Sequence, residues 1–223
     1  MIIAEQKPLE EIAQTVAGYE KVLLLGCGTC VTVCFAGGQR EVGLLASELR
    51  IKDGIAGLTR SISEATIQRQ CEWEFVDPLA ETIQAADIVL SLGCGVGVQA
   101  IAERFPKTRV VPALNTSFLG MPVAPGEWEA RCGACGQCVL AQTGGICPVV
   151  RCSKGLLNGP CGGSVNGKCE VGGGATPCGW QLIYDRLDGL GLLDTLEEIQ
   201  PPKDWRTHLG QGSRRIVREE LTK

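Results

Sequence analysis

Apolar residues in the first 120 positions recur with the periods of helices and strands in turn. Four of them between residues 9 and 16 fall at i, i+3, i+4 and i+7, between Pro8 and Gly18. Proline is favoured at the first turn of a helix and glycine just past its end, so this spacing predicts a helix between these two residues. The apolar run at 22–25 that follows predicts a first strand.

The same alternation continues to residue 111. It predicts helices at 39–49, 79–86 and 96–105 and strands at 74–76, 87–92 and 109–111. Strands separated by helical segments are typical of parallel βαβ crossovers. We therefore predict an α/β domain over residues 1–122, with a doubly wound parallel sheet that is Rossmann-like or flavodoxin-like and has the strand order 2-1-3-4.

Residues 121–131 contain Pro122, Pro125 and Gly126 and predict a linker into a different second domain, residues 123–223. Of the 47 residues from Cys132 to Cys178, 8 are cysteine, 12 are glycine and only nine are Val, Leu or Ile. Burial of so few apolar side chains cannot offset the conformational entropy lost on folding, so a bound group must organise the segment. We expect a small, irregular Gly/Cys-rich iron-sulfur module with a C-terminal helix, which the apolar residues at 180–193 predict, and a tail.

Composition and charge exclude two classes of function. A net charge of -4 and 4% aromatic residues leave neither a basic surface nor stacking platforms for nucleic acid. The uncharged stretch 22–38 contains three cysteines and is shorter than the about 20 apolar residues that span a membrane, so no membrane span is expected. Residues 1–11 lack the apolar run of a signal peptide, so we expect a cytoplasmic protein. There, 13 thiols indicate bound metal rather than disulfides.

A ferredoxin-like run of cysteines lies in the second domain. Cys132, Cys135 and Cys138 are spaced by two residues each, and Cys147 is followed by proline. This is the pattern of a [4Fe-4S] site with a lengthened last spacer, and the short spacers of small residues let the backbone wrap closely around the cluster.

Eight cysteines supply two sites of four ligands each. The spacing leaves five candidates for the fourth ligand of the triplet, among which we favour Cys178; the second site then takes the remaining four. The alternative is a pair of structural zinc sites of the ribbon type, for which two-residue spacings are equally familiar. The five candidates are Cys147, Cys152, Cys161, Cys169 and Cys178.

A further metal site is predicted in the first domain. Cys27, Cys30 and Cys34 follow the first strand, and Cys94 follows the strand at 87–92, which is its neighbour in the predicted order. The carboxyl ends of neighbouring parallel strands meet at one crevice, so these four thiols form a site for Zn or a third [4Fe-4S] cluster. Cys71 precedes the strand predicted at 74–76 and is expected at the opposite edge, as a core or free thiol.

Glycines beside these cysteines, at 26–28 and 93–97, imitate nucleotide-binding loops. No complete G-x-G-x-x-G occurs, and the cysteine side chains would occupy the space of a dinucleotide. We therefore favour metal over nucleotide.

Several motifs together resemble the small iron-sulfur subunit of the two-subunit methylenetetrahydrofolate reductases of acetate-forming anaerobes, also known as the methylenetetrahydrofolate reductase C-terminal domain family. The resemblance extends over nearly the whole chain and is densest at 132–205. The motifs are the segments 26–30 and 36–38, the cysteine run 132–152, and the segments 158–163, 178–180, 184–187 and 202–205.

The resemblance implies a non-catalytic electron-transfer role. In that family a TIM-barrel partner subunit carries the flavin, FMN, and reduces methylenetetrahydrofolate to methyltetrahydrofolate. The small subunit holds iron-sulfur clusters, is associated with zinc, and relays electrons to that flavin from a ferredoxin or another electron-donor protein.

Two other functions remain open at the level of the sequence. One is a zinc-stabilised structural adaptor for a flavin or corrinoid methyl-transfer enzyme. The other is an electron-transfer subunit of a hydrogenase or heterodisulfide-reductase-like complex, which uses the same cluster motifs.

Overall fold

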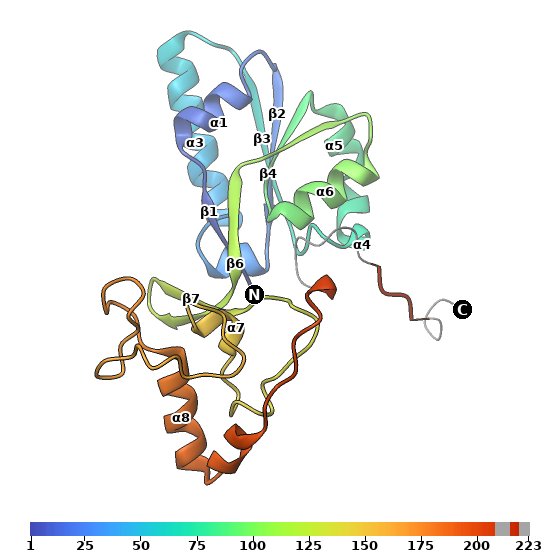
Figure 1. Cartoon of the computed structure of the whole chain (residues 1–223). Coiled ribbons are helices and arrows are strands. Elements are labelled where there is room, and N and C mark those ends of the chain that lie inside the picture. Colours follow the sequence, from blue (N-terminus) through green and yellow to red (C-terminus); the bar gives the residue numbers. More distant parts are fainter. Residues whose placement is uncertain (208–214, 219–223) are drawn as a thin grey trace. The chain divides into compact units, whose positions relative to one another are not determined.

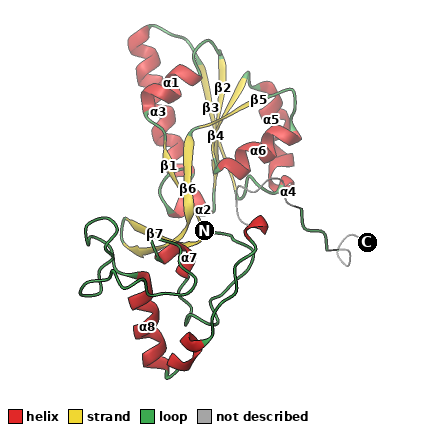
Figure 2. Ribbon diagram, viewed as in Figure 1, coloured by secondary structure: helices red, strands yellow, loops and turns green. Residues whose placement is uncertain are grey.

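The chain divides into two compact units in the computed structural model, which describes residues 1–207 and 215–218 (Figure 1). We call Met1–Trp128 the sheet unit and Glu129–Lys223 the cysteine-rich unit. The sheet unit contains most of the regular secondary structure, and the cysteine-rich unit consists largely of loops (Figure 2).

A parallel sheet of four strands forms the centre of the sheet unit. Its strands are β2 (Lys21–Cys27), β3 (Ser61–Ile67), β4 (Ile88–Leu92) and β5 (Arg109–Pro112), in the order β3-β2-β4-β5. The inner strands β2 and β4 are apolar on both faces because helices cover both sides of the sheet. The strands that precede Cys27 and Cys94 are therefore neighbours, as the sequence predicts.

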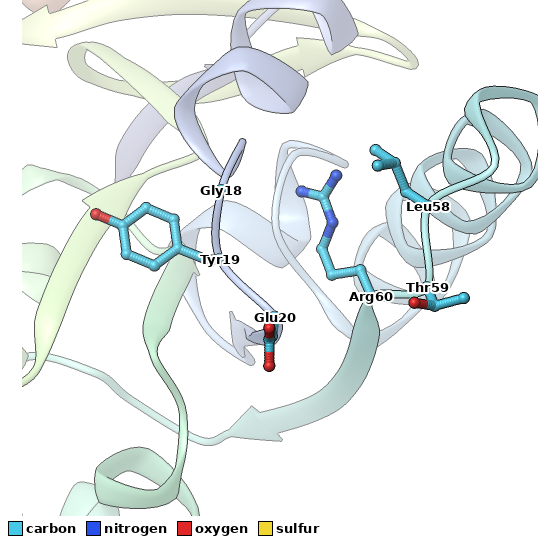
Figure 3. A pocket seen from close by; sticks show the side chains of 6 residues that line it. All are labelled: Gly18, Tyr19, Glu20, Leu58, Thr59 and Arg60. Atoms are coloured by element: carbon cyan, nitrogen blue, oxygen red, sulfur yellow. The ribbon is translucent and has the colours of Figure 1, made fainter.

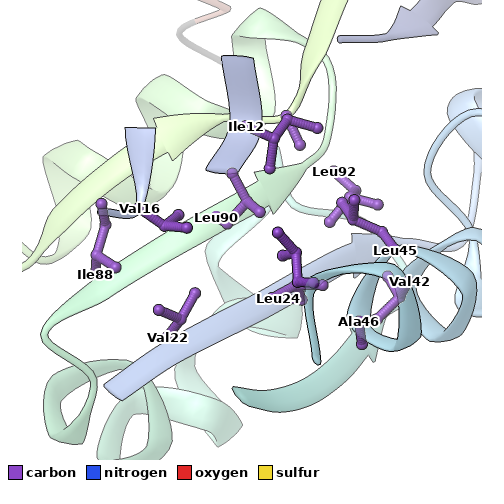
Figure 4. Close-up of a cluster of buried hydrophobic side chains, with 12 residues drawn as sticks. Ile12, Val16, Val22, Leu24, Val42, Leu45, Ala46, Ile88, Leu90 and Leu92 are labelled. Carbon is purple, nitrogen blue, oxygen red and sulfur yellow. The ribbon is translucent and has the colours of Figure 1, made fainter. Parts of the chain in front are cut away.

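Alternate residues of β2 point to opposite faces of the sheet and build two cores. Val22 and Leu24 pack with α1 (Leu9–Thr15) and α3 (Gln39–Ala56), in the cluster that Figure 4 shows. The second core lies on the other face around Leu23 and Leu25. There the covering elements are α4 (Trp73–Val76), the short 3₁₀ turn η1 (Asp77–Leu79), α5 (Ala80–Ala85) and α6 (Gly95–Arg104).

The second strand of the parallel sheet is not where the sequence predicts it. Residues 73–76 form the short helix α4, and the strand is β3, at 61–67. The sequence of β3, Ser-Ile-Ser-Glu-Ala-Thr-Ile, is largely polar because β3 is an edge strand with one half-exposed face. The correction moves Cys71, which follows β3 instead of preceding the second strand.

A second, antiparallel sheet adds strands that the sequence analysis missed. It has the order β1-β6-β7, with β1 (Ile2–Gln6), β6 (Leu114–Ala124) and β7 (Glu127–Cys132). The predicted linker at 121–131 is therefore wrong, because its residues belong to β6, β7 and the turn between them. Gly126 has φ +79° in that turn, a conformation that glycine adopts readily.

The cysteine-rich unit has little regular structure in its described part. Its helices are α7 (Pro148–Arg151), α8 (Gly179–Leu190) and two 3₁₀ turns, η2 (Leu193–Glu197) and η3 (Trp205–Thr207). The predicted C-terminal helix is confirmed as α8, which ends at Gly191 in the left-handed conformation. No described helix in either unit is long and apolar enough to cross a membrane.

Candidate metal centres

The first group of cysteines lies at the carboxyl edge of the parallel sheet. Cys27 is the last residue of β2, Cys30 begins the short helix α2 (Cys30–Val33), and Cys34 follows that helix. Cys94 directly precedes α6, in the loop after β4. Because β2 and β4 are paired and parallel, all four residues lie at one end of the sheet.

A buried cluster joins three of these cysteines. Cys27 and Cys34 are buried in it, and Cys94 packs against it. Trp128 packs against the same cluster and meets Phe35 edge to face, with ring centroids 6.1 Å apart. The indole Nε1 of Trp128 is buried without a hydrogen-bond partner, so an orphaned donor lies beside this group of thiols.

The Cys34 thiol forms hydrogen bonds to the backbone. Its Sγ donates weak hydrogen bonds to the carbonyl oxygens of Ala4 and Val31, each at 3.5 Å. Burial raises the pKa of this thiol, and the nearby charge of Cys30 raises it further. The Cys34 sulfur thus faces two backbone carbonyl oxygens.

Cys71 lies at the same edge of the sheet as the other cysteines, and its predicted place at the opposite edge is wrong. It follows β3, whose last residue, Ile67, is in register with Cys27. Burial raises the pKa of the Cys71 thiol, and the negative charges of Cys27 and Cys94 raise it further. Cys71 therefore belongs with Cys27 and Cys94 at the carboxyl edge of the sheet.

Gln70 fixes the loop that carries Cys71. This side chain is fully buried; its Nε2 donates to the Leu25 carbonyl of β2 at 2.7 Å, and its Oε1 accepts from Ser91 Oγ of β4 at 2.6 Å. A Cβ at Gly93 would collide with this amide, which explains the glycine before Cys94. Sequence analysis missed Gln70, since only its position beside a cysteine and after a strand could have indicated it.

Arg69 adds a positive charge to this edge. Arg69 forms an ion pair with Glu72, which raises the pKa of the guanidinium. The charges of Cys71 and Cys30 raise this pKa further. Arg69 therefore adds a cation two residues before Cys71 along the chain.

In the cysteine-rich unit, the triplet Cys132, Cys135 and Cys138 lies in the loop after β7. Ala134 and Gly136 both have positive φ, +47° and +79°, so the chain curls at each two-residue spacer. The Ala134 amide donates to Cys132 Sγ at 3.3 Å. Backbone amides directed at sulfur are a usual feature of iron-sulfur loops, where they stabilise negative charge.

Lys203 fastens the triplet loop from the C-terminal side. Its ammonium group donates to the Gln137 carbonyl, and the Asp204 amide donates to Gln137 Oε1 at 3.3 Å. Lys203 is only 7% exposed and lies 5.9 Å from the centre of the Trp205 ring. A buried cation beside residue 137 was not predicted; its only sequence signal was the segment 202–205.

Two of the remaining cysteines share the small core of this unit. Cys178 is buried with Trp180, Ile183 and Leu187, and Cys152 packs against that cluster. The two chain segments approach closely, because a Cβ at Gly179 would lie 2.5 Å from the carbonyl oxygen of Arg151.

Cys161 and Cys169 are linked to the same region by side-chain contacts. Cys169 Sγ lies 3.6 Å from the Oγ of Ser153, the residue after Cys152. Cys161 Sγ lies 3.8 Å from Oε1 of Glu170, the residue after Cys169, and Glu170 also pairs with Lys154. Contacts between neighbouring residues thus connect Cys152, Cys161, Cys169 and Cys178.

Cys147 lies at the other end of α7 from Cys152. Tight turns join it to Cys138, with backbone hydrogen bonds from Gly145 to Leu140 (2.9 Å) and from Ile146 to Thr143 (3.2 Å). These turns fold the lengthened spacer of the ferredoxin-like run back on itself.

The donor chemistry of both units suits thiophilic metals. Thiolates are the ligands of Zn and of iron-sulfur clusters, and the thiols are supplied by glycine-rich loops or by loops at one sheet edge. Among the described residues, no three Cys, His, Asp or Glu side chains are arranged as a group that could hold a metal ion. The case for metal binding therefore rests on the thiol ligands themselves and on the loops that bring them to the same region of each unit.

A pocket of about 420 Å³ lies away from the cysteines, at the amino ends of β2 and β3 (Figure 3). Its lining includes Arg60, which is already bound to Asp53 and to the Val16 carbonyl. No cysteine lines it. This pocket therefore contributes nothing to the metal centres.

Comparison with known proteins gives one match. The family model described as methylene-tetrahydrofolate reductase C terminal matches residues 111–206, a range that contains all eight cysteines of the cysteine-rich unit. No curated protein and no solved structure matches the chain. The cysteines of the sheet unit lie outside the matched range. Residues 111–206 are therefore similar to the C-terminal family of methylenetetrahydrofolate reductase.

Proposed function

We propose that this chain is the iron-sulfur electron-transfer subunit of a methylenetetrahydrofolate reductase complex. The observation that carries the proposal is that all eight cysteines of the cysteine-rich unit lie within the range similar to the methylenetetrahydrofolate reductase C-terminal family. A unit so rich in thiols and so poor in apolar core has the properties of a cluster-binding module.

The contacts favour a particular division of the eight ligands. Cys152, Cys161, Cys169 and Cys178 are connected through neighbouring residues and form one set. The triplet then takes Cys147, which compact turns join to Cys138. This division departs from the sequence-based preference for Cys178 as the fourth ligand of the triplet, because Cys178 is buried in the core that Cys152 packs against.

Each set of four thiolates would hold one [4Fe-4S] cluster, which supplies one-electron transfer when bound. The chain's own residues bind, shield and tune it. Trp180 and Leu187 exclude water from the side of Cys178, and the Ala134 amide donates to the sulfur of Cys132. Lys203 holds the triplet loop at Gln137 and places a positive charge there.

The site in the sheet unit would hold Zn or a third [4Fe-4S] cluster. All-sulfur ligation suits both, and neither choice changes the role of the cysteine-rich unit. The orphaned indole donor of Trp128 gives this site a group that can bond to a metal-bound sulfur.

The proposed partner is a flavin-containing TIM-barrel subunit that binds FMN and reduces methylenetetrahydrofolate. Electrons would enter from a ferredoxin or another electron-donor protein in the cytoplasm. In this arrangement the chain itself performs no reaction on the folate, and the hydride chemistry belongs to the partner's flavin.

The test is electron transfer in the purified complex. After anaerobic co-purification, the chain's clusters are reduced chemically, and reduction of the partner's flavin is followed by its absorbance. Cys135→Ser is expected to abolish one cluster and slow flavin reduction at least tenfold. Cys71→Ser makes the same chemical change in the sheet unit and is expected to keep both clusters of the cysteine-rich unit.

Other results would overturn the proposal. A colourless, iron-free native complex that still binds the flavoprotein would identify a zinc-stabilised adaptor. Co-purification with a hydrogenase or heterodisulfide-reductase-like subunit, and not with a folate-reducing flavoprotein, would identify a different electron-transfer complex.

A further inference from the structure

We propose that Cys71 is a ligand of the metal site in the sheet unit, together with Cys27, Cys30 and Cys94, and that Cys34 lies outside the coordination sphere. The inference rests on the metal-site part of the proposed function and revises its ligands. In the expected set of Cys27, Cys30, Cys34 and Cys94, Cys71 replaces Cys34.

The topology of the sheet brings Cys71 to the edge that carries Cys27 and Cys94. Cys27, Cys71 and Cys94 follow three adjacent parallel strands, β2, β3 and β4. The carboxyl ends of such strands border a single crevice, where doubly wound sheets place their ligands. The register of β2 and β3 pairs Cys27 with Ile67, and the Gly28 amide donates to the Ile67 carbonyl at 2.8 Å. The loop that leads to Cys71 therefore starts beside Cys27.

Gln70 anchors the loop that carries Cys71. Its buried amide bonds to both β2 and β4, through Leu25 and Ser91, and lies directly against Gly93. Cys71 is the next residue along the chain, so its backbone is held between the segments that carry Cys27 and Cys94. A glutamine fixed by two strands positions a ligand more rigidly than a free loop would.

The surroundings of the Cys34 thiol differ from those of the Cys71 thiol. Its sulfur faces two backbone carbonyl oxygens, those of Ala4 and Val31, at 3.5 Å each. A carbonyl oxygen repels a metal-bound thiolate, so this position suits a neutral S–H group. Cys71, by contrast, directly follows the Gln70 side chain that bonds to β2 and β4, and its thiol is exposed.

The proposed site therefore takes ligands from three loops instead of two. Four thiolates are the number that either Zn or a [4Fe-4S] cluster takes. No three of these described side chains are yet grouped as a metal site, so metal binding would draw them together. Metal binding would tie together the loops after β2, β3 and β4.

The experiment compares Cys71→Ser with Cys34→Ala in the full chain, purified anaerobically with its partner if the two are expressed together. Iron and zinc per chain are measured for each variant and for wild type. Cys71→Ser is expected to lose one zinc or about four iron, the content of one site. Cys34→Ala is expected to keep the wild-type content, and the iron of the cysteine-rich unit serves as an internal standard in both.

A second measurement needs no substitution. Cys71 is solvent-exposed, whereas Cys34 is buried, so iodoacetamide should reach Cys71 whenever it is not a ligand. Alkylation of the wild-type protein is mapped by mass spectrometry with metal bound and after chelation. Cys71 is expected to be protected at least tenfold in the metal-loaded protein and to react once the metal is removed.

Either experiment can overturn the assignment. Full metal content in Cys71→Ser, loss of the site in a natively folded Cys34→Ala, or equal alkylation of Cys71 with and without metal would each contradict it. None of these results depends on whether the cysteine-rich unit transfers electrons, so the inference can fail while the proposed function stands.

Discussion

The two units of this chain are stabilised by different means. The sheet unit buries apolar side chains on both faces of a parallel sheet, with helices over each face. In the described part of the cysteine-rich unit, the buried hydrophobic residues are Cys178, Trp180, Ile183 and Leu187. The first unit can fold by burial, whereas in the second the proposed metals would offset the entropy of ordering its glycine-rich loops.

The cysteines take different positions in these two settings. In the sheet unit, strand register and the Gln70 anchor determine where each thiol lies before any metal binds. In the cysteine-rich unit, short spacers and positive-φ residues such as Ala134 and Gly136 place them. The comparison teaches that a rigid fold can preorganise the proposed metal site, whereas the proposed metals would themselves organise an irregular module.

Removal of the metals should produce the largest difference between the two units. Chelation under reducing conditions is expected to unfold the cysteine-rich unit, since structural thiolate sites contribute on the order of 10 kcal/mol. The sheet unit should keep its helices and strands. Hydrogen exchange followed by mass spectrometry resolves the two units. Equal protection of residues 132–178 before and after chelation would show that burial alone maintains the module.

Substitution of Arg60 should test how far the sheet unit depends on its interior. Arg60 and Asp53 form a buried pair at 2.7 Å, with side chains 7% and 8% exposed. Arg60→Leu leaves the Asp53 carboxylate buried without its cation and should cost about 3–5 kcal/mol. Urea unfolding measures the change. The control is Arg104→Leu, which breaks an exposed pair with Asp77 and should cost at most about 1 kcal/mol.

A core truncation in the sheet unit should leave the metal content unchanged. Leu24 lies in β2 and is fully buried under α3, so Leu24→Ala should lower the free energy of unfolding by about 2–5 kcal/mol. Leu44→Ala, at an exposed position of α3, serves as the control and should change it by about 0.5 kcal/mol or less. Loss of iron from the cysteine-rich unit in Leu24→Ala would show that the two units do not fold independently.

The smallest effect is expected at Glu129, in the cysteine-rich unit. Arg131 holds the pKa of this carboxyl below its usual range, and Arg151 lowers it further. The ion pairs therefore stabilise the fold above the ordinary glutamate pKa, and this contribution is lost as the pH falls through the lowered value. Because Glu129 is half-exposed, Glu129→Gln should cost at most about 1 kcal/mol at pH 7. An ordinary carboxyl pKa in an NMR titration would contradict this assignment.

Sequence patterns predicted the sheet unit where apolar periodicity is strong. The helix after Pro8, the strand at 22–25 and the helix at 96–105 correspond to α1, β2 and α6. The edge strand β3 escaped because its exposed face is polar, and that single error placed Cys71 at the wrong edge. The strands β6 and β7 were taken for a linker because Pro122, Pro125 and Gly126 indicate turns. Pro122 lies in β6 beyond the residues 114–119 that pair with β1, and Pro125 and Gly126 lie in the turn before β7.

The candidate ligands themselves were evident from spacing, but their grouping was not. No pattern in the sequence brings Ser153 to Cys169 or Glu170 to Cys161, since these contacts arise from loops folded by positive-φ residues. Similarly, Lys203 lies 66 residues from Gln137, whose carbonyl it binds. Long-range contacts between irregular segments carry no periodic signal.

The most direct test of the account is the content of iron, acid-labile sulfide and zinc per chain after strictly anaerobic purification. The account predicts about eight iron and eight sulfide from two [4Fe-4S] clusters in the cysteine-rich unit. The sheet unit adds either one zinc or about four more of each. Zinc without iron would contradict the proposed electron transfer and leave a structural adaptor.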